Sequence, residues 1–323
     1  MNGGTATAVV FGYSEVGARC LEALYAAGVA VSLVVTHADD PGELRWFASV
    51  AAVAAGRSRV LTPADPAEPA LATELAALAP DFIFSFYYRR LLPQALLALA
   101  RRGALNMHGS LLPKYRGRAP VNWAVLMGEH ETGASLHYMV AKPDAGALVD
   151  QQPVPIGPDD TALIVANRVA DAAVVVLTRA LPRLIAGTAA ATPLDLTQGS
   201  YFGARRPEDG RFEWEWPAAR IHNLVRAVAP PFPGAYADLA GRRLKVNATR
   251  RLPGRAASPG QRPRVYVAEQ AVIADCADGA RLELAELELA GAPLDAARFV
   301  SVFGHDPVPA CPPARAPARA TLP

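Results

Sequence analysis

Residues 7–36 have the sequence TAVVFGYSEVGARCLEALYAAGVAVSLVVT, in which a mixed segment separates two short apolar runs. The β-branched runs Thr7–Phe11 and Val31–Thr36 predict buried strands, and Glu15–Ala27 between them predicts a helix. Such a unit joins two parallel strands of one sheet by a right-handed crossover. The opening stretch therefore predicts an α/β fold.

The same alternation continues and enlarges the predicted sheet. Further helices are expected at Leu44–Ala55, Glu68–Leu78, Pro93–Arg101 and Thr161–Ile185, and further strands at Arg59–Leu61, Asp81–Phe86, Ala104–His108, Ser135–Val140 and Leu148–Ile156. We predict a Rossmann-like, doubly wound, mostly parallel sheet. Ligands of such sheets bind at the carboxyl ends of the strands.

Beyond Gly199 the chain becomes rich in turns. Short strands are expected at Ala235–Leu239, Leu244–Ala248, Val265–Ala268, Ala271–Ile273 and Arg281–Leu289. We therefore predict a catalytic domain over residues 1–206 and a small β-rich domain over 207–305. The Pro/Ala/Arg-rich tail 306–323 is expected to be disordered.

Composition excludes several classes of protein. The 323 residues are 51% hydrophobic and 19% charged, which indicates a globular chain. The net charge of 32 − 30 = +2 does not favour nucleic-acid binding through the overall field. Residues 242–264 are basic and lack acidic side chains, but Pro and Gly interrupt them and one aromatic residue borders them, so we favour a solvated basic face over a phosphate contact.

The cysteines and the N-terminus indicate the compartment. Cys20, Cys276 and Cys311 form no C-x-x-C pair, so neither a disulfide framework nor a thiolate zinc site is expected. The first residues lack the basic and apolar regions of a secretory signal, and no apolar run is long enough to span a bilayer. We expect a cytoplasmic chain with no membrane partner.

Two familiar kinds of site are not predicted. Gly12 and Gly17 lack the G-x-G-x-x-G spacing of dinucleotide-binding turns, and we interpret them as allowing a tight turn and close helix packing. His37-x-Asp39 and Glu129-His130-Glu131 have no third ligand at helical or hairpin spacing. We interpret both as solvated loop groups and expect no metal.

The chemistry-bearing stretch is NMHGSLLPKYRGRAP at residues 106–120. Asn106 and His108 lie two positions apart at the end of a predicted strand, so their side chains share one face. A carboxylate, Asp144, lies in a turn between two later strands. If Asp144 approaches His108 it should raise the histidine pKa and orient the ring, while the amide of Asn106 could donate to an oxyanion. These three residue types suit acyl transfer.

The N-x-H pair, SLLPKYRGRAP and the D-A-G turn at 144–146 resemble the formyltransferases that use 10-formyltetrahydrofolate. Among these the chain is most similar to UDP-4-amino-4-deoxy-L-arabinose formyltransferases, over about residues 5–250. The pieces that carry this likeness are FSFYYRRLLP at 84–93, APVNWAVLMGEHETGASLHYMV at 119–140, SYFGARRPEDG at 200–210 and HNLVRAVAPPFPGAY at 222–236.

The resemblance implies roles for individual residues. Its catalytic Asn, His and Asp fall on Asn106, His108 and Asp144. The folate-binding positions would be Arg90, Leu91, Leu92, Arg118, Val140, Ala141, Lys142 and Pro143, and the wall beside the sugar nucleotide would include Tyr115 and Arg116. The C-terminal module would resemble an OB-like barrel.

The implied reaction is formyl transfer from 10-formyltetrahydrofolate to the amine of a UDP-linked amino sugar, without a metal. It would belong to lipopolysaccharide biosynthesis and lipid A modification. The well-known arabinose enzyme also carries a downstream decarboxylase, and we expect no such second reaction from these 323 residues. The expected partners are small molecules, and a homo-oligomer is compatible with the sequence.

Three alternatives remain open. Methionyl-tRNA formyltransferases share the N-x-H and SLLP core, although their loop is usually closer to R-W-R-G-A-A-P than to the sequence at 114–118. A hydrolase would release formate from the same folate without any amine. A non-catalytic folate-binding protein would keep the pocket without turnover.

Overall fold

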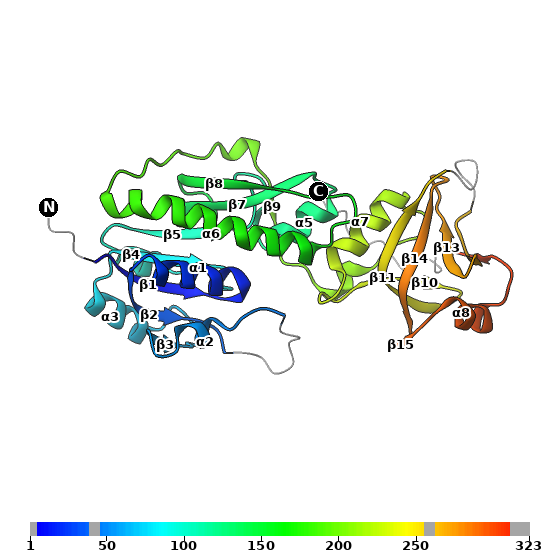
Figure 1. Cartoon of the computed structure of the whole chain (residues 1–323), viewed down its shortest axis with the longest axis horizontal. Helices are drawn as coiled ribbons and strands as arrows, with labels where there is room; N and C mark the ends of the chain where they lie inside the picture. The colour runs from blue at the N-terminus through cyan, green and yellow to red at the C-terminus, as the bar shows by residue number, and fades with distance from the viewer. Residues whose placement is uncertain (1–4, 39–45, 255–261, 311–323) are drawn as a thin grey trace. The chain divides into compact units, whose positions relative to one another are not determined.

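The computed structural model describes residues 5–38, 46–254 and 262–310 (Figure 1). The chain forms two compact units. The first comprises Met1–Val121, His130–Ile156 and Ile164–Ala204, and the second comprises Asn122–Glu129, Gly157–Leu163 and Arg205–Pro323. Our expectations for Asp39, Leu44 and Cys311 concern positions outside the described residues.

The first unit is built on a seven-stranded sheet in the order β3-β2-β1-β4-β5-β7-β8, whose labels can be followed in Figure 1. The pairs from β3 to β5 are parallel, and β7 pairs antiparallel with both β5 and β8. The predicted doubly wound, mostly parallel sheet is therefore confirmed. Its strands are β1 (Thr7–Gly12), β2 (Ala30–Val35), β3 (Arg59–Leu61), β4 (Phe82–Phe86), β5 (Gly103–His108), β7 (Glu131–Tyr138) and β8 (Leu148–Pro155).

Helices cover both faces of this sheet. Helices α3 (Pro69–Leu78) and α4 (Gln94–Leu97) bury Leu71, Leu75 and Leu96 against one face of β1, β2 and β4. On α1 (Ser14–Ala26), which contacts β1 and β4, Arg19 forms an ion pair with Asp171 of α6 (Ala162–Ala186), so these two helices lie side by side. With both faces covered, β1 and β4 are buried along almost their whole length, which explains why their sequences are predominantly apolar.

Two predicted helices are shorter than expected. The structure has α2 at Val50–Ala54 rather than Leu44–Ala55, and it begins after Ser49, whose Oγ accepts from the Ala52 N–H at 3.4 Å. The helix predicted at Pro93–Arg101 is confined to α4. Its end is set by tertiary hydrogen bonds, because the N–H groups of Arg101 and Arg102 donate to carbonyls next to β4 instead of continuing the helix.

The first unit also contains a small ribbon that the sequence did not predict. Strand β6 (Arg116–Gly117) pairs in parallel with β9 (Tyr201–Phe202). Two residues are too few for a periodic pattern, so tertiary pairing alone reveals this ribbon. It joins the loop after β5 to the segment after α6, close to the site described below.

The second unit is an antiparallel sheet in the order β10-β11-β14-β13-β12-β16. Among the described strands, β10 and β16 are the two edges of this order, so the sheet is an open half-barrel, in agreement with the small β-rich, OB-like module expected from sequence. Its strands are β10 (Ala235–Leu239), β11 (Arg242–Leu252), β12 (Arg264–Ala268), β13 (Ala271–Asp275), β14 (Arg281–Leu289), β15 (Ala292–Pro293, paired with β14) and β16 (Val308–Pro309).

Three further helices and two 3₁₀ turns complete the part of the chain that the structure describes. Helix α7 (Ala218–Val228) packs on β10, β11 and β14, and α8 (Ala296–Phe303) packs on β12 and β13. Helix α5 spans Pro120–Leu126, and the 3₁₀ turns span Leu196–Gln198 and Pro207–Gly210.

One expectation for this C-terminal part needs correction. The predicted disordered tail, residues 306–323, includes an ordered strand, because Val308 is buried and β16 pairs with β12. The basic side chains of the 242–264 segment that the structure describes are mostly exposed, as expected, and some of them form ion pairs, such as Arg250 with Glu283 and Arg264 with Asp275. Residues 255–261 and 311–323 lie outside the described part of the chain. No helix in the described part is both long and apolar enough to span a membrane.

Candidate active site

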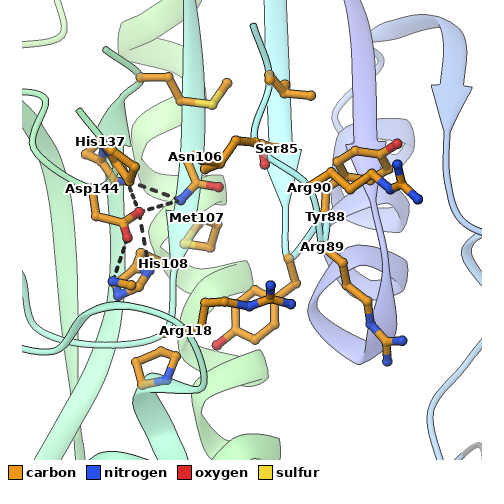
Figure 2. Close-up of a pocket in the computed structure, with 18 of the residues that line it drawn as sticks. Ser85, Tyr88, Arg89, Arg90, Asn106, Met107, His108, Arg118, His137 and Asp144 are labelled. Atoms are coloured by element: carbon orange, nitrogen blue, oxygen red, sulfur yellow. Dashed lines mark hydrogen bonds and ion pairs between the residues drawn. The ribbon is translucent and has the colours of Figure 1, made fainter. Parts of the chain in front are cut away.

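A cavity of about 420 Å³ opens at the carboxyl ends of β4 and β5, within the first unit (Figure 2). Its size falls in the range of small-molecule pockets. Its walls come from the end of β5, the segment that follows β4, the loop after β7 and Tyr201 of β9. This is the edge of the sheet at which the sequence predicts a ligand.

The pairing of β5 with β7 brings the first polar side chains together. Asn106 lies directly opposite His137 in the antiparallel ladder, and His108 lies opposite Ser135. Directly opposed residues have side chains on the same face of a sheet. Asn106 and His137 are in contact as a result, with 3.2 Å between Nδ2 of Asn106 and Nε2 of His137.

Asp144 reaches this pair from the turn between β7 and β8. The turn is tight: Asp144 has a left-handed φ of 51°, and a Cβ on Gly146 would lie 1.9 Å from the Tyr138 carbonyl oxygen. Oδ1 of Asp144 lies 3.5 Å from Nδ2 of Asn106 and 3.6 Å from Nδ1 of His108. Figure 2 shows Asn106, His108, His137 and Asp144 gathered at one side of the cavity.

The second oxygen of Asp144 is held by the backbone. The N–H of Gly117, on β6, donates to Oδ2 at 2.8 Å. Burial alone would raise the pKa of Asp144, but the neighbouring charge of His108 and hydrogen bonds from His137 and Gly117 lower it to about 2. Asp144 is therefore a carboxylate at neutral pH, with a side chain that is 13% exposed.

His108 is buried and held on its other edge. Its Nε2 lies 2.8 Å from the carbonyl oxygen of Tyr115, which can only accept, so Nε2 carries the proton. We expected Asp144 to raise the pKa of His108. Burial in fact lowers that pKa, and the opposing effects of Asp144 and the Tyr115 carbonyl only partly offset it. The ring is thus neutral at neutral pH, with its lone pair on Nδ1.

His137 is the site residue that sequence reasoning missed. It lies in a predicted strand, and its side chain is 2% exposed beside both Asn106 and Asp144. The available signal was a histidine inside the predicted strand Ser135–Val140, because a polar side chain buried in a strand needs a partner.

The other walls combine cations with apolar side chains. Arg89, Arg90 and Arg118 line the cavity, and Figure 2 shows Arg89 and Arg90 across from Asp144. The described residues include few exposed large apolar side chains, yet three of them lie here: Leu91 at 74%, Val140 at 45% and Tyr201 at 58% exposure. Exposed apolar surface beside cations is typical of a binding site for a ligand with a flat ring and an anionic end.

Most of the expected folate-binding positions surround this cavity. Arg90, Leu91, Leu92, Arg118, Val140, Ala141 and Pro143 line it, whereas Lys142 is exposed and does not.

Tyr115 and Arg116, expected in the sugar-nucleotide wall, are not among the lining residues. Both are buried: the Tyr115 ring stacks on Phe202 at 5.2 Å, and Arg116 lies in β6. Tyr115 positions His108 through its carbonyl oxygen, and Arg116 belongs to the β6–β9 ribbon, whose Gly117 N–H holds Asp144.

His37, interpreted from sequence as a solvated loop group, is instead packed beneath the cavity wall. Its ring stacks on Tyr88 at 4.2 Å, and its Nε2 accepts from the Arg89 N–H at 3.1 Å. Burial and the charges of Arg89 and Arg90 lower the pKa of His37 to about 4. The neutral ring therefore anchors the segment that follows β4. Within the described ranges, no group of three or more His, Cys, Asp or Glu side chains could hold a metal ion.

Both halves of the chain match one protein family. Residues 7–181 match "Formyl transferase", and residues 205–304 match "Formyl transferase, C-terminal domain". The chain belongs to the formyl transferase family. The prediction that it is a formyltransferase enzyme is thereby confirmed, together with the fold class.

Solved structures with the same fold include sugar N-formyltransferases. An N-formyltransferase from Helicobacter canadensis, in complex with folinic acid and dTDP-3-aminofucose, has a TM-score of 0.69 at 19% identity, over 87% of this chain and 99% of that one. WlaRD, a sugar 3N-formyl transferase solved in the presence of dTDP and 5-N-formyl-THF, has a TM-score of 0.67 at 17% identity, over 87% and 97% of the two chains.

HypX from Aquifex aeolicus, in complex with tetrahydrofolic acid, has a TM-score of 0.62 at 20% identity. This chain aligns over 92% of its length and covers 47% of that protein. At such identities the three likenesses establish a common fold. What each protein binds remains a property of that protein.

Proposed function

We propose that this formyltransferase transfers the formyl group of 10-formyltetrahydrofolate to the amine of a nucleotide-linked amino sugar, UDP-4-amino-4-deoxy-L-arabinose. The observation that carries the proposal is the convergence of Asn106, His108 and Asp144 on one wall of the cavity. Carboxamide, imidazole and carboxylate are the groups that acyl transfer to an amine requires.

The cavity suits a formylated folate. The donor carries a flat ring system and an anionic glutamate tail, and the cavity offers the apolar surfaces of Leu91 and Val140 beside the charges of Arg90 and Arg118. Arginine is well suited to carboxylates because its planar fork can donate two parallel hydrogen bonds. Those side chains would hold the donor with its formyl group toward Asn106 and His108.

The proton chemistry follows from the protonation states. The neutral sugar amine attacks the formyl carbon, and its nitrogen must then lose a proton. Nδ1 of His108 holds the available lone pair, and an imidazolium formed there is stabilised by Asp144 at 3.6 Å and by the Tyr115 carbonyl at 2.8 Å. The same proton then passes to the leaving nitrogen of tetrahydrofolate, which restores neutral His108.

The cavity also contributes through proximity. Holding donor and acceptor in one site removes translational freedom before the reaction, an effect that reaches about 7–11 kcal/mol in well-oriented systems. The burial of His108 and the contacts of the largely covered Asp144 keep their positions fixed while this occurs.

The acceptor is supported by likeness and not by a mapped subsite. The loop at 110–120 resembles that of the arabinose formyltransferases, and two solved structures of the same fold are of sugar N-formyltransferases, one with an amino-sugar nucleotide and the other with dTDP. The expected role in lipid A modification belongs to this same proposal, since it depends on the acceptor.

The test is a product assay with several acceptors. Purified protein is incubated with 10-formyltetrahydrofolate and, in separate reactions, UDP-4-amino-4-deoxy-L-arabinose, a dTDP-linked 3-amino sugar, methionyl-tRNA, or no acceptor. Mass spectrometry of the acceptor and release of tetrahydrofolate are the readouts. We expect a product heavier by one formyl group in the first reaction. Formate release at the same rate without acceptor, or formylation of the tRNA alone, would contradict the proposal.

A further inference from the structure

A row of polar side chains crosses the sheet beside His108. His108 on β5 lies directly opposite Ser135 on β7, and Ser135 lies directly opposite Gln151 on β8. Directly opposed residues have their side chains on the same face of a sheet. The three side chains therefore share one face, although Ser135 and Gln151 do not line the cavity.

The loop that follows β5 is fastened to this row. Nε2 of Gln151 donates to the Leu112 carbonyl oxygen and to Oγ of Ser135, both at 2.8 Å. The same Oγ accepts from the Leu112 N–H at 3.1 Å and donates to the Ser110 carbonyl oxygen at 2.5 Å. Side chains of β7 and β8 thus hold both polar groups of the Leu112 backbone.

The donors and acceptors of this network allow one arrangement of the Gln151 amide. The Ser110 carbonyl can only accept, so it takes the hydroxyl hydrogen of Ser135 and leaves Oγ free to accept from Gln151. The Leu112 carbonyl also only accepts, so the nitrogen of the Gln151 amide must face it. Turning the amide over would set its oxygen against that carbonyl, which is unfavourable where water has little access.

The anchored loop ends at the group that holds His108. Three residues beyond Leu112, the Tyr115 carbonyl oxygen accepts from Nε2 of His108 at 2.8 Å. Within the loop, Oγ of Ser110 donates to the Lys114 carbonyl oxygen at 2.6 Å, which ties its start to its end. The anchor at Leu112 therefore limits where the Tyr115 carbonyl can lie.

We infer that Gln151 is a positioning residue for His108: its amide holds the loop on the sheet, and the loop holds the Tyr115 carbonyl on Nε2. This role deepens the proposed function and rests on it. With Nε2 held, Nδ1 and its lone pair keep a fixed direction, which proton transfer from the attacking amine requires. Release of the loop would let the ring turn and would slow that transfer.

A pair of matched variants on β8 tests the role. Met has about the length of Gln but no hydrogen to donate, so Gln151→Met leaves the Leu112 carbonyl without this donor. Gln152→Met is the same change one residue along the strand, where the side chain lies on the opposite face. We expect kcat to fall by about tenfold or more in Gln151→Met and to change little in Gln152→Met. Equal losses in the two variants would overturn the inference.

A double-mutant cycle with His108→Ala distinguishes positioning from a general defect. If Gln151 acts through His108, Gln151→Met should not lower the residual single-turnover rate of His108→Ala any further. The KM for 10-formyltetrahydrofolate should also stay unchanged, because Gln151 does not line the cavity. The same fold-loss in the wild-type and His108→Ala backgrounds would overturn the inference, since a distorted fold would slow both.

Nuclear magnetic resonance observes the held ring without any acceptor sugar. The Nε2–H of His108 is buried and hydrogen-bonded, so ¹⁵N-labelled protein should show a slowly exchanging imidazole signal that is absent from His108→Ala. We expect Gln151→Met to lose this signal and Gln152→Met to keep it. An unchanged signal in Gln151→Met would overturn the inference. A wild type that shows this pattern but formylates no amino sugar would overturn the proposed function instead.

A second variant covers the case in which Gln151→Met does not fold. Gln151→Glu keeps the shape of the side chain but offers only acceptors when it is ionised, so the same loss of kcat and of the His108 signal is expected. Failure of both variants to fold would overturn the inference, because Gln151 would then be required by the fold as a whole.

Discussion

Nδ1 of His108 lies 3.6 Å from Oδ1 of Asp144, a separation just too long for a hydrogen bond and short enough for an ion pair. The neutral ring has its lone pair at Nδ1, so no hydrogen lies between the two atoms until His108 takes up a proton. The carboxylate thus favours the imidazolium that forms during the reaction. Burial, which lowers the pKa of His108, keeps the ring neutral beforehand.

The pH dependence of Asp144→Asn follows from this relationship. Neutral His108 is the active form, so wild-type kcat should rise with pH and level off above a pKa that burial holds below the ordinary 6.5. Removing the carboxylate takes away an effect that raises this pKa. The acid limb of Asp144→Asn should therefore move to lower pH, while the plateau falls by about tenfold or more because the proton acceptor is weaker.

The measurement is a kcat profile from about pH 5 to about pH 9 for both proteins. Asn tolerates the left-handed backbone of position 144 and can still accept from the Gly117 N–H, so the fold should survive. An acid limb that stays in place or moves to higher pH would show that Asp144 does not act on His108.

The contact between Gly109 and Tyr87 predicts that Tyr87→Phe partly suppresses the loss of stability caused by Gly109→Ala. A Cβ on Gly109 would lie 1.8 Å from the Tyr87 hydroxyl oxygen and 2.9 Å from its Cζ. That hydroxyl is buried and has no hydrogen-bond partner in the described part of the chain. Gly109→Ala should therefore destabilise the protein by about 1–3 kcal/mol, the usual cost of overpacking.

Tyr87→Phe removes the worst contact and should be close to neutral on its own. The double variant should then recover part of the stability that Gly109→Ala loses. Urea unfolding of the four proteins gives the coupling energy. Strict additivity of the two changes would show that the hydroxyl is not what excludes a side chain at position 109.

The low pKa of His37 predicts that the folded protein loses stability in mild acid. Its folded pKa of about 4 lies below the ordinary 6.5, so the unfolded chain binds more protons between these values. Its contribution to stability is complete above about pH 6.5 and is lost as the pH falls toward 4. His37→Gln keeps an acceptor for the Arg89 N–H but does not titrate.

The unfolding free energies of wild type and His37→Gln should therefore converge, or reverse in order, as the pH is lowered from about 7.5 to about 4.5. Parallel curves over that interval would mean that His37 is solvated, as the sequence first suggested.

Replacing Arg118 should weaken binding of the folate without affecting folding. It is exposed, lines the cavity, and faces the place proposed for the folate. Arg118→Ala should raise the KM for 10-formyltetrahydrofolate by about tenfold, since charge-assisted hydrogen bonds contribute roughly 1.5–3 kcal/mol. Arg250→Ala, in the second unit, removes an equal charge and should leave that KM unchanged. Equal effects of both changes would point to net charge alone.

The sheet could be predicted from sequence because its strands carry their own signal. Runs such as Ala8–Phe11 and Phe82–Phe86 are buried on both faces and are therefore apolar, with Ser85 as the one exception. The N-x-H spacing places Asn106 and His108 on one face because side chains alternate between the two faces of a strand. What the sequence could not give was the length of α4, which ends where backbone groups of Arg101 and Arg102 find partners beside β4.

The rest of the site depends on contacts between distant segments. His137 matters because the β5–β7 register puts it opposite Asn106, and no local pattern encodes that register. Tyr115 holds His108 through its backbone carbonyl, which any residue possesses, so the identity of residue 115 could not reveal this role. Its side chain stacks on Phe202 away from the cavity, and this contact between distant segments has no local sequence pattern. The direction of the His108 pKa shift depends on burial, which the sequence does not quantify.

The most direct test of the formyl-transfer account is the single-turnover rate of His108→Ala. Enzyme in excess is mixed with 10-formyltetrahydrofolate and UDP-4-amino-4-deoxy-L-arabinose, and the formylated sugar is quantified over time. We predict efficient transfer by the wild type and a decrease of about 100-fold or more in the variant, with unchanged affinity for the folate. A variant that forms the formylated sugar at the wild-type rate would contradict the account.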